Sequence, residues 1–310
     1  LAAPARPLLA RRGYDFRLSA GSLAAGGTLG ILIPPSIILM IYGILTQTNI
    51  GHLFVAGVIP GLLGLLMYLG VIYVIARVSP QDAPRGERTT MAEKLHALRG
   101  VWPFTLLFVL IIGGLYGKIF TATEAAGMGA GLALILALSQ RRMSWQSFRQ
   151  IFIETATTSV MLYSVLFGAM LFAKLISFSG LGEGILELFN DAGLGPWQTI
   201  VAILFVFLLL GCVMDSLAII LICVPLFVPI LLAHGFDLVW FGIIVVVVTE
   251  IALITPPIGM NVFVLKATLP HVRLGPIFRG LTPFIAIDVV RLALLVIFPS
   301  ISLALVAFMK

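Results

Sequence analysis

Charged residues are scarce in this 310-residue chain: they make up 10% of the sequence, whereas 60% of its residues are hydrophobic. No charged residue occurs between Arg17 and Arg77, and the mean hydropathy is +1.15. Soluble globular domains carry about 25% charged residues. The composition therefore excludes a water-soluble globule and predicts an all-α polytopic membrane protein.

Cysteine, histidine and the usual catalytic motifs are also scarce. The two cysteines, Cys212 and Cys223, lie in apolar sequence without a CxxC spacing, so neither a disulfide framework nor a metal site is indicated. The four histidines fall in loops or at the ends of apolar segments, and the sequence contains neither HExxH nor GxSxG. We therefore predict no enzyme activity and no organic cofactor.

Apolar segments of about 20 residues, the length of one membrane crossing, fill most of the chain. Candidates lie at roughly 18–46, 54–76, 101–118, 122–139, 152–177, 198–232, 238–267 and 281–308. The segment 198–232 is too long for one straight crossing, and its interior has a single charge, Asp215. We expect a re-entrant hairpin that turns near Gly211 to Ser216, with two closely spaced full crossings as the alternative.

The formal net charge of +6 is distributed as expected for membrane orientation and not for nucleic-acid binding. Lys and Arg gather in alternate connections, namely before residue 18 and at 77–100, 140–150 and 266–280. The connections at 47–53, 178–197 and 233–237 have none, and Lys118 is the exception to the pattern. Basic connections are typical of the cytoplasmic side.

Two adjacent prolines occur twice, in "ILIPPSIIL" and "LITPPIGMN", and Pro256 follows Pro34 by 222 positions. The same offset aligns "PLLARRGYD" with "PILLAHGFD", and Gly57 and Pro60 match Gly280 and Pro283 with one further residue. On the expected path the first broken helix runs outward and the second inward. We therefore predict an inverted repeat, a design typical of secondary transporters.

A proline within a helix removes an amide donor and clashes with the preceding turn, at a cost of roughly 3 kcal/mol or more. Two in succession should unwind the chain, leaving free amides for an anion and free carbonyls for Na+. The candidate ligand residues at these breaks are Gly27, Thr28, Gly30, Pro34, Pro35 and Ser36 in the first, and Thr255, Pro256, Pro257, Gly259 and Asn261 in the second. For Na+ we expect backbone carbonyls near Gly27, Thr28, Thr255 and Gly259. Ordinary proline kinks are the alternative.

Several further polar residues allow two interpretations. Asp215 and Ser216, beside Gly211, either bind a cation or substrate or cap the hairpin, because an acidic residue at bilayer depth is costly and usually functional. Thr121 and Thr123, with Glu124, either join the site or cap a helix.

Glu250 either borders the cavity or forms a pair within the helix bundle. Asp288 and Arg291 are three residues apart, which favours an internal ion pair.

These motifs together resemble the large membrane subunit, the M subunit, of tripartite ATP-independent periplasmic (TRAP) transporters. The stretches that carry the resemblance are "RRGYD", "GGTLGILIPPSI", "FTATEAAGMGA", "LGCVMDSLAIILICVPLFVPI" and "LITPPIGMNVFV". Family members have further helices and a first re-entrant hairpin before "RRGYD". The resemblance therefore implies that the N-terminal part is absent from this sequence.

The resemblance implies Na+-coupled, elevator-type import of a small organic acid across a bacterial inner membrane. Family substrates are C4-dicarboxylates, 2-oxo acids, sialic acid and sugar acids, delivered by a periplasmic binding protein (P subunit), and a small membrane subunit (Q subunit) completes the system. A stand-alone Na+/dicarboxylate or other ion-coupled carrier is the alternative.

The resemblance also suggests a division into transport and scaffold parts. We expect transport segments at 1–53 (the end of a first hairpin and the first broken helix), 119–139 and 198–268. Scaffold segments are expected at 54–118, 140–197 and 269–310, with cytoplasmic arms at 77–100 and at the start of 140–197. Within these arms, 85–99 and 144–151 have the amphipathic pattern of short surface helices.

Overall fold

The computed structural model describes residues 13–84, 90–117, 119–140, 143–191, 193–268 and 274–308, and every regular element among them is an α-helix. The chain forms two compact units. One combines the described residues before 85 with those from Ser179 onward, and the other contains those between 90 and 178. The helices that follow the two breaks belong to the same unit as the broken helices.

The first broken helix consists of α2 (Phe16–Leu29) and α3 (Ile37–Thr46), and the second of α11 (Leu238–Ile254) and α12 (Met260–Thr268). Each interruption contains a PP pair, as the sequence predicts, and the bond within each pair is cis. Helix α11 lies at the centre of its unit, because all its residues from Val239 to Ile254 are buried. A helix that is apolar all round fits such a position.

The chain enters the two broken helices by the same backbone geometry. Gly13 and Gly235 have φ values of 74° and 73°, a conformation that favours glycine. Asp15 then caps α2 by accepting from the amides of Arg17 and Leu18, and Asp237 caps α11 by accepting from those of Val239 and Trp240. These pairs lie 222 residues apart, as the sequence repeat predicts.

The helices that follow the breaks, α4 (Ile50–Val78) and α13 (Leu274–Ile297), each contain one of the matched prolines, Pro60 or Pro283. The expected crossing at 281–308 is wrong in its bounds, because α13 starts earlier and ends at Ile297, before α14 (Ser300–Ala307). Pro299 separates the two helices, and a proline disfavours helical geometry in the residue before it.

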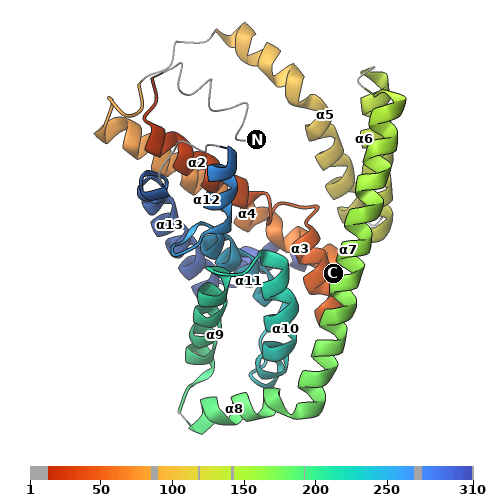
Figure 1. Ribbon diagram of the computed structural model, residues 1–310, viewed down its shortest axis with the longest axis vertical. Helices are drawn as coiled ribbons and strands as arrows, with labels where there is room; N and C mark the ends of the chain where they lie inside the picture. The colour runs from red at the N-terminus through yellow and green to blue at the C-terminus, as the bar shows by residue number, and fades with distance from the viewer. Residues whose placement is uncertain are drawn as a thin grey trace. The chain divides into compact units, whose positions relative to one another are not determined.

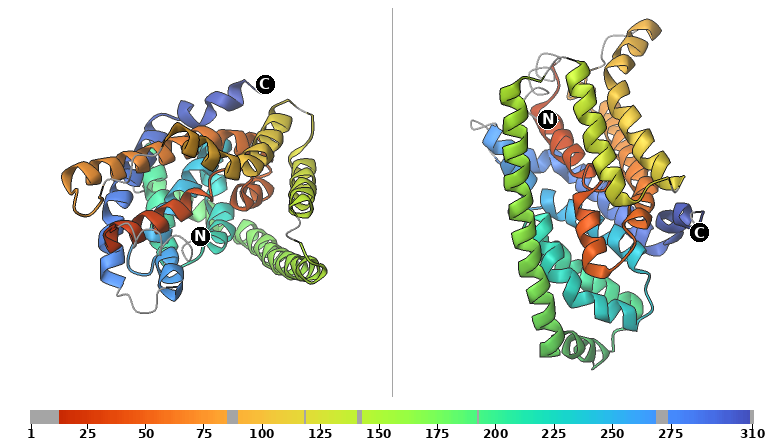
Figure 2. Two further views of the ribbon diagram at one scale, coloured as in Figure 1. Left: turned by 90° about the horizontal axis from the view of Figure 1, so that it is seen from above. Right: turned by 90° about the vertical axis from the view of Figure 1, so that its right-hand side faces the viewer.

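A hairpin forms where the sequence predicts one. After α8 (Leu181–Asp191), α9 (Pro196–Gly211) and α10 (Ser216–Ala233) run side by side from a short turn (Figures 1 and 2). With 16 residues, α9 is about 24 Å long at 1.5 Å per residue.

In the second unit, α5 (Met91–Tyr116) packs on α6 (Ala122–Ser139), and α7 (Trp145–Ser179) follows (Figure 2). Separate short helices at 85–99 and 144–151 are wrong, because 91–99 and 145–151 are the first turns of α5 and α7. Thr90 and Glu93 form a capping box that starts α5 there, and nothing breaks the helix after it. Residues 85–89 and Lys118 lie outside the described residues. The first 12 residues, where the end of a first hairpin was expected, lie outside them as well.

Four of the described helices are long and apolar enough to cross a membrane: Ile50–Val78, Trp145–Ile176, Ser216–Ala233 and Leu274–Ile297. Shorter apolar helices include α3 of the first broken helix and the central α11. The chain is therefore a multi-pass membrane protein.

Helices α2 and α13 pack closely against each other at two glycines. A Cβ at Gly280 would lie 2.0 Å from the carbonyl oxygen of Arg17, and one at Gly21 would lie 2.4 Å from that of Gly280. The backbones touch, so neither position has room for a side chain.

We expect Gly280→Ala to force α2 and α13 apart and to lower the melting temperature in detergent, because overpacking a tight contact costs about 1–3 kcal/mol. Gly275→Ala is the matched control in the same helix, since no described atom lies within 4 Å of the place that its methyl group would take. Equal melting temperatures for the two variants would contradict the close packing.

Candidate functional site

The two breaks border the same hydrophobic core. Leu29, at the end of α2, and Ile254 and Val262, on either side of the second break, are buried in one cluster. Helix α2 also packs against both α11 and α12. The two interruptions, about 220 residues apart in sequence, therefore flank one packed region.

In the first break, Ser36 connects the two helix ends. Its hydroxyl donates to the carbonyl of Ile31 at 2.5 Å and accepts from the amide of Leu39 at 3.2 Å, so it caps α3. Thr28 is buried and its hydroxyl donates to the carbonyl of Ala25 at 2.7 Å. The side-chain oxygens of Thr28 and Ser36 are thus engaged in holding backbone.

The remaining candidates of the first break differ in exposure. Gly27 and Gly30 are exposed and Pro35 is exposed, whereas Pro34 is buried. The glycines leave the last turn of α2 without a covering side chain. The Thr28 carbonyl of this turn accepts from the amide of Ile31 at 2.9 Å, so one of the candidate Na+ carbonyls also holds the backbone of the break.

The second break has a similar construction. The Thr255 hydroxyl donates to the carbonyl of Ile251 at 2.6 Å, and Gly259, with φ 60°, accepts from the amide of Val262 at 2.8 Å. Pro256 and Pro257 are exposed, and Asn261 is half-buried in the first turn of α12.

The hairpin turn lies beside the second break. A Cβ at Gly211 would come within 2.4 Å of Cβ of Ala252, three residues before Thr255, so the end of α9 rests on the end of α11. Asp215 is exposed and accepts from the amide of Ala218 at 2.8 Å, capping α10, of which Ser216 is the first residue. The structure thus brings Gly211 to the second break and gives Asp215 a capping contact.

Thr121 and Thr123 belong to the other compact unit. Thr121 caps α6 in a capping box with Glu124, whose carboxylate accepts from the Thr121 amide at 2.7 Å. Both Thr121 and Thr123 are exposed, as is Glu124. Capping, one of the two interpretations of this motif, is therefore present.

A buried charged network lies next to the breaks. Arg291 contacts Glu250 at 2.5 Å and Asp288 at 3.1 Å, and the Tyr68 hydroxyl donates to Asp288. The internal Asp288–Arg291 pair is confirmed, and Glu250 forms a pair within the bundle. Sequence reasoning missed Tyr68, although the offset that joins Gly57 to Gly280 also places Tyr68 opposite Arg291.

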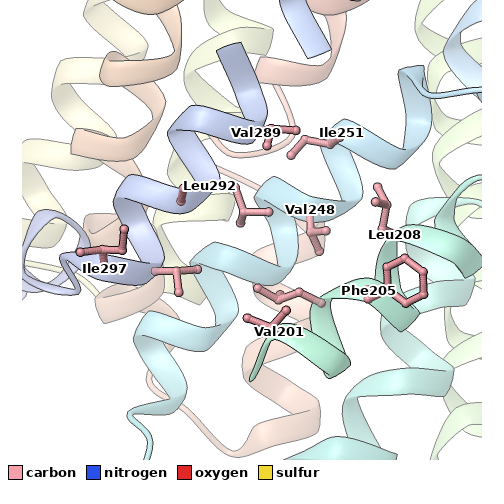
Figure 3. A pocket seen from close by; sticks show the side chains of 11 residues that line it. Val201, Phe205, Leu208, Val248, Ile251, Val289, Leu292 and Ile297 are labelled. Atoms are coloured by element: carbon pink, nitrogen blue, oxygen red, sulfur yellow. The ribbon is translucent and has the colours of Figure 1, made fainter. Parts of the chain in front are cut away.

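A separate apolar groove of about 370 Å3 lies between α9, α11 and α13 (Figure 3). Its lining consists of aliphatic side chains and one phenylalanine, among them Val201, Phe205, Val248 and Leu292. Because no charged or hydrogen-bonding side chain lines it, this groove offers nothing to a small anion. No cluster of three or more His, Cys, Asp or Glu occurs among the described residues.

Paired interruptions set within a bundle of apolar helices are typical of secondary transporters. Residues 1–301 match the family model of the tripartite ATP-independent periplasmic transporter, DctM component. The chain belongs to this family.

Curated relatives are large permease proteins of TRAP transporters. The chain is 39% identical to the C4-dicarboxylate protein DctM of Pseudomonas aeruginosa, over 96% of this chain and 69% of that protein. Identity is 33% to the ectoine protein TeaC of Halomonas elongata, over 97% of this chain and 70% of the relative. Identity is 31% to the sialic acid protein SiaM of Vibrio cholerae, over 94% of this chain and 68% of the relative.

We expect Ser36→Ala to destabilise the first break, because it removes the cap of α3 and the contact with Ile31, and loss of an N-cap costs about 1 kcal/mol. The control is Ser22→Ala in α2, where the hydroxyl only donates to the nearby carbonyl of Ser19. Thermal melts in detergent should show a lower midpoint for Ser36→Ala alone. A Ser36→Ala midpoint equal to that of the wild type would contradict this role.

Proposed function

We propose that the protein is the large membrane subunit of a TRAP transporter that imports a small organic acid together with Na+ across the bacterial inner membrane. The paired PP breaks carry the proposal. Helix ends inside a membrane present amides with partial positive charge and carbonyls with partial negative charge, which suit a carboxylate and Na+ respectively. Family membership supports the assignment as a transporter component.

The ion and substrate site comprises the first break from Gly27 to Ser36, the second from Thr255 to Asn261, and the turn from Gly211 to Ser216. Na+ binds backbone carbonyls near Gly27, Thr28, Thr255 and Gly259. Supporting observations are the exposure of Gly27 and Gly30, the shared core of the two breaks and the contact of Gly211 with Ala252. In the other unit, Thr121 and Thr123 of α6 are the further candidates.

Transport follows an elevator mechanism in which the broken helices and the hairpin move together. The moving part comprises the segments expected from the sequence, 1–53, 119–139 and 198–268, and the packing of α2 and α9 against α11 supports a joint movement of the broken helices and the hairpin. A re-entrant path is supported by α9, which at about 24 Å falls short of a hydrocarbon core of about 30 Å. Helix α10 is itself long and apolar enough to cross, as the alternative of two full crossings requires.

The partners are a small membrane subunit and a periplasmic binding protein, the other two components of a tripartite system. The named substrates of the relatives range from C4-dicarboxylate to ectoine and sialic acid. A C4-dicarboxylate is the first substrate to test, because it is the one named for the relative with 39% identity.

Reconstitution in liposomes with both partner proteins tests this function. We expect uptake of a radiolabelled C4-dicarboxylate to require an inward Na+ gradient and the binding protein. A K+ gradient of equal size is the control. Equal uptake without the binding protein would support the stand-alone carrier instead, and uptake independent of Na+ would refute the coupling.

Asp215→Asn separates ion binding from capping, because asparagine caps helices about as well as aspartate but carries no charge. If Asp215 binds a cation, Asp215→Asn should lose most of its uptake while keeping its melting temperature. The matched control is Asp237→Asn, which changes an equivalent cap of α11. Wild-type uptake by Asp215→Asn would leave Asp215 as a cap only.

A further inference from the structure

Four side chains from three helices form the buried network beside the breaks: Tyr68 from α4, Glu250 from α11, and Asp288 and Arg291 from α13. Glu250, Asp288 and Arg291 have no exposed surface, and Tyr68 is 4% exposed. Two carboxylates thus surround one guanidinium, with the Tyr68 hydroxyl as a further donor to Asp288. The network joins the second broken helix to both helices that follow the breaks.

The Arg291 guanidinium lies in a slot in the surface of α4. A Cβ at Gly64 would be 2.0 Å from Nη1 of Arg291 and 2.8 Å from a methyl carbon of Leu29. The missing side chain at Gly64 therefore lets Arg291 pass close to α4 and to the end of α2, where the first break begins. Any side chain at this position would displace the guanidinium.

Glu250 holds the guanidinium from the α11 side through its carboxyl group. Oε2 of the same carboxyl group is held by Arg291 at 2.5 Å. Glu250 also precedes Thr255 by five residues, and Arg291 shares the slot at Gly64 with Leu29, whose carbonyl accepts from the amides of Leu32 and Ile33 inside the first break. These contacts join the helix that ends at the second break to the backbone of the first.

The repeat does not require this network. The offset of 222 places Thr28 opposite Glu250, and the offset of 223 places Leu65 opposite Asp288 and Tyr68 opposite Arg291. The charges therefore occur in the second half alone, although both halves form the same broken helix.

Stability gives little reason for the network either. Replacing a buried ion pair by apolar side chains is often neutral or stabilising. Nε and Nη1 of Arg291 and Oε1 of Glu250 have no hydrogen-bond partner among the described residues, which adds to the cost of burial. A role in placing the break accounts for contacts that stability alone does not favour.

We propose that Tyr68, Glu250, Asp288 and Arg291 are positioning residues of the transport site: they fix the backbone of the first break relative to α11 and thereby set its affinity for the coupling ion. In this proposal none of the four is a ligand of the ion or the substrate. The effect on ion affinity rests on the proposed function. Control of the position of the break does not, and it holds for the protein whatever it transports.

Gly64→Ala is the most direct test, because it displaces the guanidinium without changing a charged residue. Tyr68→Phe removes the donor to Asp288 and provides a second, smaller change. The matched controls in α4 are Gly70→Ala, where no described atom lies within 4 Å of the added methyl, and Tyr73→Phe, where the side chain is 60% exposed. All variants are made in the full chain with its partner proteins.

Hydrogen–deuterium exchange of the Gly30–Ile33 amides measures the position of the break without any ligand. We expect about tenfold faster exchange in Gly64→Ala, and a smaller increase in Tyr68→Phe, because a charge-assisted contact is lost. Exchange at wild-type rates in both variants would overturn the proposal. Uniformly faster exchange over α4, α11 and α13 would show a structural role only and would also overturn it.

The Na+ dependence of uptake tests the proposed effect on ion affinity. We expect the KM for Na+ to rise about tenfold in Gly64→Ala with little change in maximal rate, and to stay unchanged in both controls. Faster exchange with an unchanged KM would refute the effect on ion affinity. If wild-type uptake were independent of Na+, the proposed coupling would fail, whereas the exchange result would still decide whether the network positions the break.

Discussion

Backbone amides and carbonyls without partners are unstable in hydrocarbon, and the placement of both PP breaks depends on this constraint. Each interruption leaves such groups behind, so each needs protein around it or water beside it. The structure supplies the protein: Leu29, Ile254 and Val262, which flank the breaks, are buried in one core. Ser36 and Thr255 satisfy individual carbonyls with their hydroxyls. The exposed Gly27 and Gly30 add no side chain of their own over the backbone of this turn.

The two halves share a backbone plan but differ in their side chains. Both begin with a glycine of positive φ and an aspartate cap, and both are interrupted at a PP pair. Yet α11 is buried from Val239 to Ile254, whereas α2 has exposed glycines in its last turns. Where the first half has Thr28, the second has Glu250. The helix before the second break is thus packed along its length, whereas the helix before the first break has exposed residues in its last turns.

The elements that could be predicted from sequence are those defined by local chemistry. Proline pairs unwind helices wherever they occur, so the breaks followed directly from Pro34, Pro35, Pro256 and Pro257, and the turn before Ser216 followed from the length of the apolar segment. Long-range packing could not be predicted in the same way. The slot at Gly64 and the contact of Tyr68 with Asp288 depend on how α4 and α13 cross, which periodicity does not specify. The end of α13 at Ile297 does not follow from apolar length, because the apolar segment continues beyond Pro299, which separates α13 from α14.

Apolar packing explains why these helices associate but not why they hold one register, because dispersion and hydrophobic contacts are not directional. Directional contacts between distant helices converge on α11 and α13. Tyr42 in α3 donates to the carbonyl of Leu238, and Trp240 donates to that of Leu295, both near the start of α11 or the end of α13. The Glu250–Arg291 pair fixes the opposite end of α11, close to the breaks. Fixed at both ends, α11 cannot slide along α13 without breaking hydrogen bonds that no lipid or apolar neighbour would replace.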